Sequence, residues 1–349
     1  MERHVEEKIQ RYTDVFEHPA GDKTQVLYQF LLPPTDKTPV RPELRRDNMQ
    51  ERIDWAKRKY EYEMEISRIL DDDSVPALDV NTSTAIFAQA FGAEVYYPKG
   101  GIPCGKHFIS EPEQSRALKV PKLEDSTLMY YFDIADELHR FGGEDAIIRI
   151  ADIQDPIGIA GILWDKAELL YTMLEDPECV HELTDKIYTL LTAFLDEWFR
   201  RYGKRFAGHY PYYVMNSGVS VSVDEVGLVS PALFREFFAD NLNKLSERYG
   251  GIGIHCCALS EHQFENFSKI QGLKLMNIYR PNLLRKQAYE IFKDICVQCH
   301  GDFVDGVPRY IGVEPEGMVP QGARVIYREP VESLDEALRK CDEYAKRFR

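Results

Sequence analysis

The stretch 219-VSVSVDEVGLVSPALFREFFADNLNKLSERYGGIGIHCC-257 predicts two β-strands, 219–224 and 252–257, with a helix between them. Ser230 and Pro231 are a typical helix start, and the apolar residues after them recur at helical spacing until a Gly-Gly pair ends the helix. A strand, a helix and a second strand in this order predict a right-handed crossover between parallel strands. The stretch therefore indicates an α/β fold.

The same alternation continues on both sides of this stretch. A long helix is predicted from Asp176-Pro177 to Gly203, and the charged segment 42–69 is predicted to be an amphipathic helix outside the sheet. An open doubly wound sheet is the alternative to a barrel, although no Gly-x-Gly-x-x-Gly or P-loop pattern follows any predicted strand. The further strands are predicted at 75–80, 146–150, 273–278, 295–300 and 324–327.

Composition narrows the classes of partner. The 349 residues include 58 acidic and 43 basic ones, and the net charge of −15 repels nucleic acid and anionic lipid, which favours a small-molecule or protein partner. No apolar run approaches the roughly 20 residues that a membrane helix needs, and the charged start is unlike a signal peptide, so a cytoplasmic location is predicted. Seven cysteines, an odd number, favour free thiols, a metal site or core packing over disulfides.

Polar residues gather at the carboxyl ends of the predicted strands. Because strand side chains alternate, each segment has an inward and an outward face, and in a barrel the polar face near the carboxyl end is predicted to point inward. The residues assigned to this face are Ser222, Asp224, His255, Cys257, Asn277, Tyr279, His300, Asp302, Tyr327 and Glu329.

Two pairs on this face suggest chemistry, and each has a simpler interpretation. His255 and Cys257 aim an imidazole and a thiolate at one point, which suits zinc, but taken alone the pair favours a hydrogen-bonded histidine beside a buried free cysteine. His300 and Asp302 form either an acid/base pair or a hydrogen-bonded pair at the barrel rim.

The remaining candidates are also ambiguous. Asp224 either anchors an NH-bearing substrate group or caps the following turn. The aromatic residues Tyr210, Tyr212 and Tyr213 either line a pocket wall or pack in a loop. Cys296 and Cys299 have zinc-knuckle spacing, but three residues apart on a strand they point to opposite faces, so a zinc knuckle is discounted.

In combination, five segments resemble the uroporphyrinogen decarboxylase superfamily, over a region from about residue 146 to the C-terminus. This resemblance implies a single (β/α)₈ TIM-type barrel, preceded here by an N-terminal helical extension at 1–74, with the barrel domain at 75–349. The superfamily includes cofactor-free uroporphyrinogen decarboxylases and zinc-dependent methyltransferases that pass methyl groups from a corrinoid protein to a thiol. The segments are VSVDEVGLVSPALFREFF, GIGIHCCALSEH, GLKLMNIYRP, VQCHGD and LEDPECVHELTDKI.

The departures from the superfamily patterns favour the methyltransferases. The Arg-Gln-Ala-Gly-Arg loop with which the decarboxylases clamp their substrate is missing. His255 and Cys257 reproduce the His-x-Cys motif of the methyltransferases, whereas the last strand, ARVIYREP, has Arg328 and Glu329 where their second cysteine is expected. Zinc accepts carboxylate oxygen, so Glu329, or else His300, is the predicted further ligand.

The resemblance leads to a specific functional hypothesis. We predict zinc-assisted methyl transfer from a corrinoid protein to a thiol, and we expect a homodimer because many related barrels dimerise. Decarboxylation of a tetrapyrrole without a cofactor is the alternative, with Asp224 stabilising a protonated pyrrole-like intermediate, and a non-catalytic binding barrel ranks last. The assigned roles are zinc ligation for His255, Cys257 and Glu329, catalysis for Asp224, His300 and Asp302, and substrate contact for Ser222, Asn277, Tyr279 and Tyr213.

Overall fold

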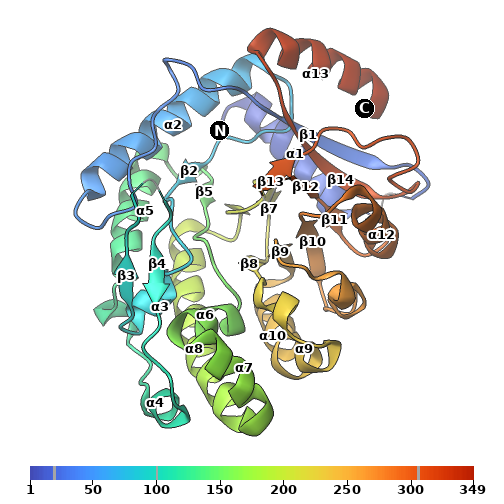
Figure 1. The fold of residues 1–349 in the computed structure, drawn as a ribbon. Coiled ribbons are helices and arrows are strands. Elements are labelled where there is room, and N and C mark those ends of the chain that lie inside the picture. Colours follow the sequence, from blue (N-terminus) through green and yellow to red (C-terminus); the bar gives the residue numbers. More distant parts are fainter. Residues whose placement is uncertain (19–20, 100, 305–306) are drawn as a thin grey trace.

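The computed structural model describes residues 1–18, 21–99, 101–304 and 307–349 (Figure 1). In this part of the chain, strands lie toward the centre and the longer helices cover them on the outside. The strands are β1 (Gln25–Leu31), β2 (Leu78–Asp79), β3 (Glu94–Tyr96), β4 (Cys104–Lys106), β5 (Ile148–Arg149), β6 (Phe206–Ala207), β7 (Val214–Met215), β8 (Val219–Ser222), β9 (Ile252–Cys256), β10 (Leu273–Ile278), β11 (Val297–Gln298), β12 (Gly301–Val304), β13 (Val307–Tyr310) and β14 (Arg324–Pro330).

Thirteen α-helices are present in the described residues, and none of them is both long and apolar enough to cross a lipid bilayer. They are α1 (Arg3–Glu17), α2 (Met49–Ile69), α3 (Ile86–Ala90), α4 (Pro112–Ala117), α5 (Met129–Gly142), α6 (Pro156–Leu163), α7 (Lys166–Glu175), α8 (Pro177–Tyr202), α9 (Pro231–Phe237), α10 (Ala239–Tyr249), α11 (Phe264–Phe267), α12 (Asn282–Phe292) and α13 (Leu334–Phe348).

Parallel pairing dominates the central sheets, as the sequence predicts. Six strands form one parallel sheet in the order β1-β14-β11-β10-β9-β8, and β2, β5 and β6 form a second parallel set with β7 antiparallel at its edge. A parallel bridge between Gln154 and Ser222 joins the segment after β5 to β8. The α/β fold is confirmed, and this arrangement is compatible with the predicted barrel.

The local helix signals are also confirmed. The Asp176 carboxylate accepts a hydrogen bond from the Cys179 backbone N–H at the start of α8, and the Ser230 hydroxyl accepts one from Leu233 at the start of α9. The predicted helix between β8 and β9 is in fact two helices, because the backbone breaks at Phe238 between α9 and α10. Gly250, in the left-handed conformation, ends α10.

One strand of the large sheet was not predicted. Strand β1 lies inside the segment expected to be a helical extension, and it pairs in register with β14, from Gln25 opposite Arg324 to Leu31 opposite Pro330. Its partner β14 lies near the other end of the chain, so no local sequence pattern predicts this pairing. The proposed boundary between residues 74 and 75 thus separates two strands of the same sheet.

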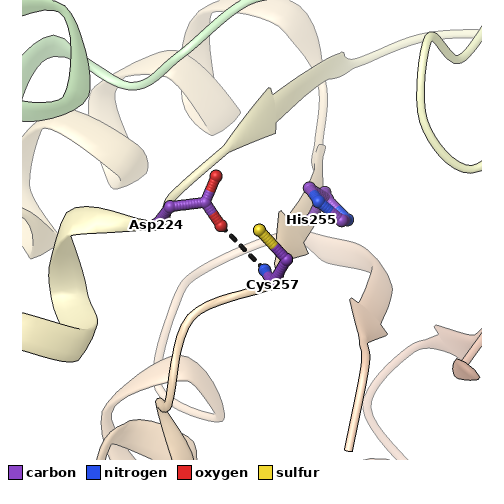
Figure 2. A group of neighbouring side chains, drawn as sticks. All are labelled: Asp224, His255 and Cys257. Carbon is purple, nitrogen blue, oxygen red and sulfur yellow. Dashed lines mark hydrogen bonds between the residues drawn. The ribbon is translucent and has the colours of Figure 1, made fainter. Parts of the chain in front are cut away.

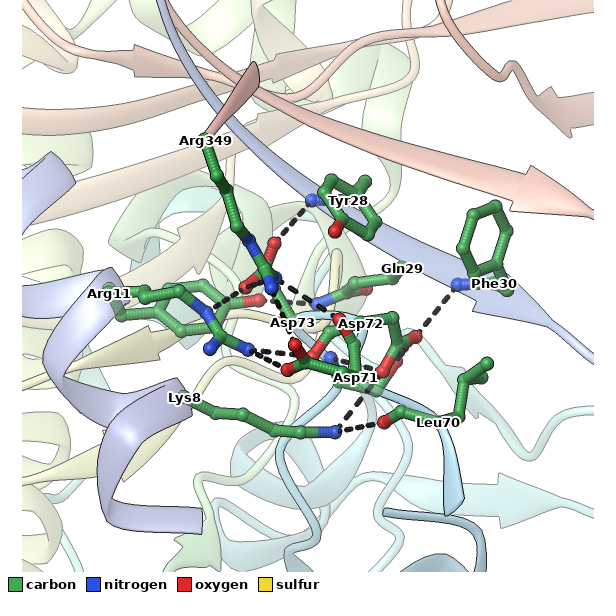
Figure 3. Close-up of polar contacts among 12 residues, drawn as sticks. Lys8, Arg11, Tyr28, Gln29, Phe30, Leu70, Asp71, Asp72, Asp73 and Arg349 are labelled. Atoms are coloured by element: carbon green, nitrogen blue, oxygen red, sulfur yellow. Dashed lines mark hydrogen bonds and ion pairs between the residues drawn. The ribbon is translucent and has the colours of Figure 1, made fainter. Parts of the chain in front are cut away.

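Buried carboxylates join β1 to the segment that leads into β2 (Figure 3). The Phe30 N–H donates to Asp72 at 3.0 Å, and the Tyr28 N–H donates to Asp73 at 2.8 Å. The Asp73 N–H donates in turn to the Tyr28 carbonyl oxygen at 2.7 Å. Lys8 pairs with Asp72, and Arg11 and Arg349 pair with Asp73. These ion pairs connect helix α1 and the C-terminal residue to the junction between β1 and the segment before β2, which we call the seam.

Candidate metal centre

Three side chains converge at the carboxyl ends of β8 and β9. A ligand atom of Asp224, one of His255 and one of Cys257 all lie within 4.8 Å of one another, and Figure 2 shows the cysteine sulfur between the carboxylate and the imidazole. Ser222 pairs with His255 across the two parallel strands, which brings Asp224, two residues further on, level with Cys257. The three side chains therefore point toward one another, as expected if they share the face predicted for them.

The His255 ring is held by Asn277 on the adjacent strand β10. The His255 Nδ1 atom lies 2.5 Å from the Asn277 Oδ1 atom, and the Asn277 amide donates to the Cys299 carbonyl oxygen. Because the amide oxygen can only accept, Nδ1 carries a proton, and Nε2 is the ring nitrogen left for a metal. Metal-binding histidines are oriented in this way, with one ring nitrogen engaged by the protein and the other available as the ligand.

Asp224 and Cys257 lie close enough to influence each other. The Cys257 backbone N–H donates to Asp224 Oδ1 at 2.7 Å, and burial, followed by the Asp224 charge, raises the pKa of the Cys257 thiol. Without a cation, a thiolate beside this carboxylate is therefore disfavoured. A divalent metal reverses that preference, and one nitrogen, one sulfur and one oxygen ligand with a fourth position open fit a catalytic zinc site.

Further residues surround the three candidate ligands, and of these Arg280, Asp152 and His209 were not assigned from the sequence. The Tyr210 ring lies 4.6 Å from the His255 ring, and its hydroxyl is hydrogen-bonded to that of Tyr279 at 2.7 Å. The Arg280 guanidinium donates to the Cys257 carbonyl oxygen at 3.1 Å. Asp152, whose pKa is raised by burial, lies 3.4 Å from His209 Nε2 and close enough to His255 and Asp224 to feel their charges.

Comparison with known proteins defines the family. Residues 74–302 match the family model described as uroporphyrinogen decarboxylase (URO-D). The chain belongs to the uroporphyrinogen decarboxylase family. Among solved structures it is similar to a methyltransferase from Methanosarcina mazei, with a TM-score of 0.60 and 14% sequence identity over 97% of this chain and 99% of that one. A search of curated proteins finds no match. The resemblance predicted from the sequence is thus confirmed, and the structural similarity supports the fold.

Not every residue predicted for the site of this URO-D family protein reaches the three ligands. The Glu329 carboxylate pairs with Lys340 and accepts a hydrogen bond from the Tyr344 hydroxyl at 2.6 Å, both on α13. Its neighbour Arg328 is instead buried against the rings of Tyr212 and Tyr310. On β14, Arg328 rather than Glu329 therefore points inward, which is the opposite of the prediction. Glu329 points outward because its partners lie on α13, which covers the outside of the sheet.

His300 also does not reach the candidate ligands, because both of its ring nitrogens have other partners. Its Nδ1 accepts from the Ile278 N–H at 3.2 Å, and its Nε2 lies 2.9 Å from Gln298 Oε1. Burial, followed by the charge of Arg285, lowers the pKa of His300 to about 3. Asp302 lies 3.4 Å from Arg285 rather than forming the expected acid/base pair with the histidine. Both histidine nitrogens are thus occupied, which does not favour metal binding or proton transfer by this ring.

Protein stability should therefore depend on His300 in mildly acidic solution. The unfolded chain protonates this ring near pH 6.5, whereas the folded chain does so only near pH 3, so folding loses stability as pH falls through this window. Between pH 6.5 and pH 5 the loss is about 2 kcal/mol. Urea titrations of the wild type and His300→Gln should show a steeper decline in the wild type. Parallel declines would contradict the assignment.

The predicted substrate residue Tyr213 is buried below the strand ends. Its ring stacks on Phe16 with centroids 6.0 Å apart, and a Cβ atom at Gly253 would lie 2.3 Å from its hydroxyl. Any side chain at position 253 would therefore clash with the Tyr213 hydroxyl, so glycine is required there. Cys296 and Cys299 are buried as well, and burial raises the pKa of each thiol to about 12, as expected for packed cysteines.

Proposed function

We propose that this protein is a zinc-assisted methyltransferase that passes a methyl group from a corrinoid protein to a thiol. The observation that carries the proposal is the convergence of Asp224, His255 and Cys257, with Nδ1 of the histidine engaged by Asn277. In this assignment Asp224 takes the place in the ligand set first given to Glu329. Zinc bound there supplies Lewis acidity, which lowers the pKa of a coordinated acceptor thiol.

The surrounding side chains provide the other requirements of thiol activation. Asn277 engages Nδ1 of the imidazole, so Nε2 is the ring nitrogen that we expect to bind the metal. The Asp152 carboxylate, whose pKa is raised by burial, is placed to accept the proton that the acceptor thiol releases, with His209 beside it. Tyr210 and Tyr279 cover one side of His255 and limit the access of water. We expect Ser222 and Tyr279 to contact the acceptor.

An apolar rim offers a surface for the protein partner. Leu228, Leu259 and Leu283 follow β8, β9 and β10, and their exposed fractions are 56%, 69% and 79%. Since these strands are parallel, the three leucines follow the same sheet edge as the ligand group. Exposed leucines near a reactive centre favour a docked protein that presents its methyl group there.

Decarboxylation of a tetrapyrrole has weaker support. A substrate with many carboxylates requires several cations in its pocket. The residues around the ligand group include Asp152, Asp224 and Glu261, and Glu261 lies 3.6 Å from the buried Arg280. This acidic environment suits a cation better than a polyanion.

Methyl transfer can be measured directly. Zinc-loaded protein incubated with methylcobalamin and 2-mercaptoethanol should form the methyl thioether, and Cys257→Ser should lower the rate by about 100-fold or more, as expected when a reacting group loses its electrostatic stabilisation. Cys104→Ser, at an exposed cysteine, serves as the matched control. Decarboxylation of uroporphyrinogen without thioether formation would instead establish the alternative activity.

A further inference from the structure

A cavity of about 250 Å³ lies inside the fold, away from the three candidate ligands. Strands β1, β5 and β14, helix α2 and the segment around residue 75 contribute to its wall. None of Asp224, His255 and Cys257 lines it. Arg149, Tyr212, Tyr213, Arg328 and Ser67 do, so the cavity combines buried cations with hydroxyl groups.

Arg328 is the most informative of these lining residues. Its side chain is 3% exposed, and its Nε and Nη1 atoms have no hydrogen-bond partner in the part of the chain that the structure describes. No carboxylate of the described residues forms an ion pair with it. A buried guanidinium normally has such partners, because leaving its charge and its donors unsatisfied costs several kcal/mol.

Aromatic contacts do not replace the missing acceptors. The Arg328 guanidinium lies over the rings of Tyr212 and Tyr310, at 4.7 Å and 4.1 Å from the ring centroids. Stacking of this kind compensates part of the charge, but it uses the face of the guanidinium. The N–H groups point outward in the plane of the group and still require oxygen atoms.

The charges around the cavity leave a local positive excess. The Arg149 guanidinium also lies over the Tyr212 ring, 3.6 Å from its centroid, so two guanidinium groups contact one ring. Arg149 is balanced by Asp79 at 3.2 Å, and the lining acids Glu63 and Asp72 are paired with Lys59 and Lys8. Arg328 alone among these charged lining residues lacks a counterion.

A hydroxyl group strengthens the argument for a ligand. Ser67 lines the same cavity, and its buried hydroxyl lacks a hydrogen-bond partner among the described residues. Unsatisfied buried donors are rare in native proteins, and several at one cavity indicate that a bound molecule satisfies them. A planar guanidinium fork with a hydroxyl on the same cavity wall matches the oxygen atoms of a carboxylate, sulfonate or phosphate.

We infer that this cavity binds a small molecule carrying one oxyanion group, which Arg328 recognises through its Nε and Nη1 atoms. The single unpaired cation and the modest volume favour a ligand with one such group and a short apolar part. Binding at this cavity requires neither zinc nor the proposed methyl transfer, because the candidate metal ligands lie outside its wall.

Thermal unfolding of metal-depleted full-length protein tests the inference. Sodium butyrate, 1-propanesulfonate and inorganic phosphate are each added at constant ionic strength, with butyramide as the uncharged control. At least one oxyanion should raise the melting temperature of the wild type by about 2 °C or more at saturation. The oxyanion that acts identifies the ligand class. The same addition should leave Arg328→Met unchanged, and Arg328→Lys should respond less than the wild type.

The unliganded variants separate binding from a structural role. Replacing a buried cation that lacks a counterion should leave the melting temperature of Arg328→Met equal to or above that of the wild type. A fall of several degrees without ligand would overturn the inference, since Arg328 would then be part of the scaffold. Equal stabilisation of both proteins by an oxyanion, stabilisation by butyramide, or no response to any of the three oxyanions would overturn it as well.

Discussion

Cys257→Ser is expected to abolish stoichiometric zinc binding by this protein. The wild type, purified without a tag and with its thiols protected, should contain about one zinc ion per chain, bound by one nitrogen, one sulfur and one oxygen ligand. Serine removes the only sulfur of the set and leaves a hydroxyl that does not ionise at neutral pH. Metal analysis after dialysis, with chelator competition for the affinity, measures the loss.

A graded series makes this test specific. His255→Ala should remove zinc as completely as Cys257→Ser, whereas Asn277→Ala should lower the affinity by about 10- to 100-fold, because it acts through the orientation of the imidazole. Cys104→Ser removes an exposed thiol outside the site and should retain full zinc content. Wild-type zinc content in Cys257→Ser would refute the ligand assignment.

The convergence of these three residues was predictable from local rules, although Asp224 was predicted to be a catalytic residue and Glu329 the third ligand. Asp224, His255 and Cys257 lie at the ends of consecutive parallel strands, where alternation fixes the inward face and adjacency brings the ends together. Asn277 was placed correctly on the next strand, but its contact with His255 was not foreseen. A strand pattern gives the direction of a side chain and leaves its hydrogen-bond partner undetermined.

The errors arose where the deciding partner is distant in sequence. Strand β14 carries Tyr327, Arg328 and Glu329 in succession, and its polar pattern fits either face. The outward position of Glu329 follows from Lys340 and Tyr344 on α13, which the strand itself does not encode. Strand β1 was missed for a similar reason, since its pairing partner is at the far end of the chain.

Asp152 was overlooked although a signal for it existed. It follows β5 as Asp224 follows β8, and the same strand-end rule would have selected it. Tyr210 was named as a residue of a pocket wall or a packed loop, because it lies in an irregular segment after β6 where neither helical nor strand periodicity applies. Its contact with His255 depends on the course of that segment through the fold.

Replacement of Asp72 by alanine is expected to destabilise the fold strongly, because it removes one partner of a buried ion pair at the seam between β1 and the segment before β2. Lys8 and Asp72 form an ion pair at 3.3 Å with exposed side-chain fractions of 1% and 2%, and Asp72 also accepts the Phe30 N–H (Figure 3). The alanine variant leaves the lysine charge buried with the Leu70 carbonyl oxygen as its remaining acceptor. Removing one partner of a buried pair costs about 3–5 kcal/mol, and urea titration measures this loss in the free energy of unfolding.

The neighbouring Asp71 is the matched control, because it offers the same chemistry in the same segment with a side chain that is 71% exposed. Its pairs with Arg11 and Arg349 lie at the surface, so Asp71→Ala should cost about 1 kcal/mol or less. Combining Asp72→Ala with Lys8→Met should recover part of the loss, since the unpaired charge is then removed. If Asp71→Ala and Asp72→Ala lower the free energy of unfolding equally, the buried carboxylate of Asp72 does not stabilise the seam. The seam would then rest on the backbone hydrogen bond from Asp73 to Tyr28 and on apolar packing around β1.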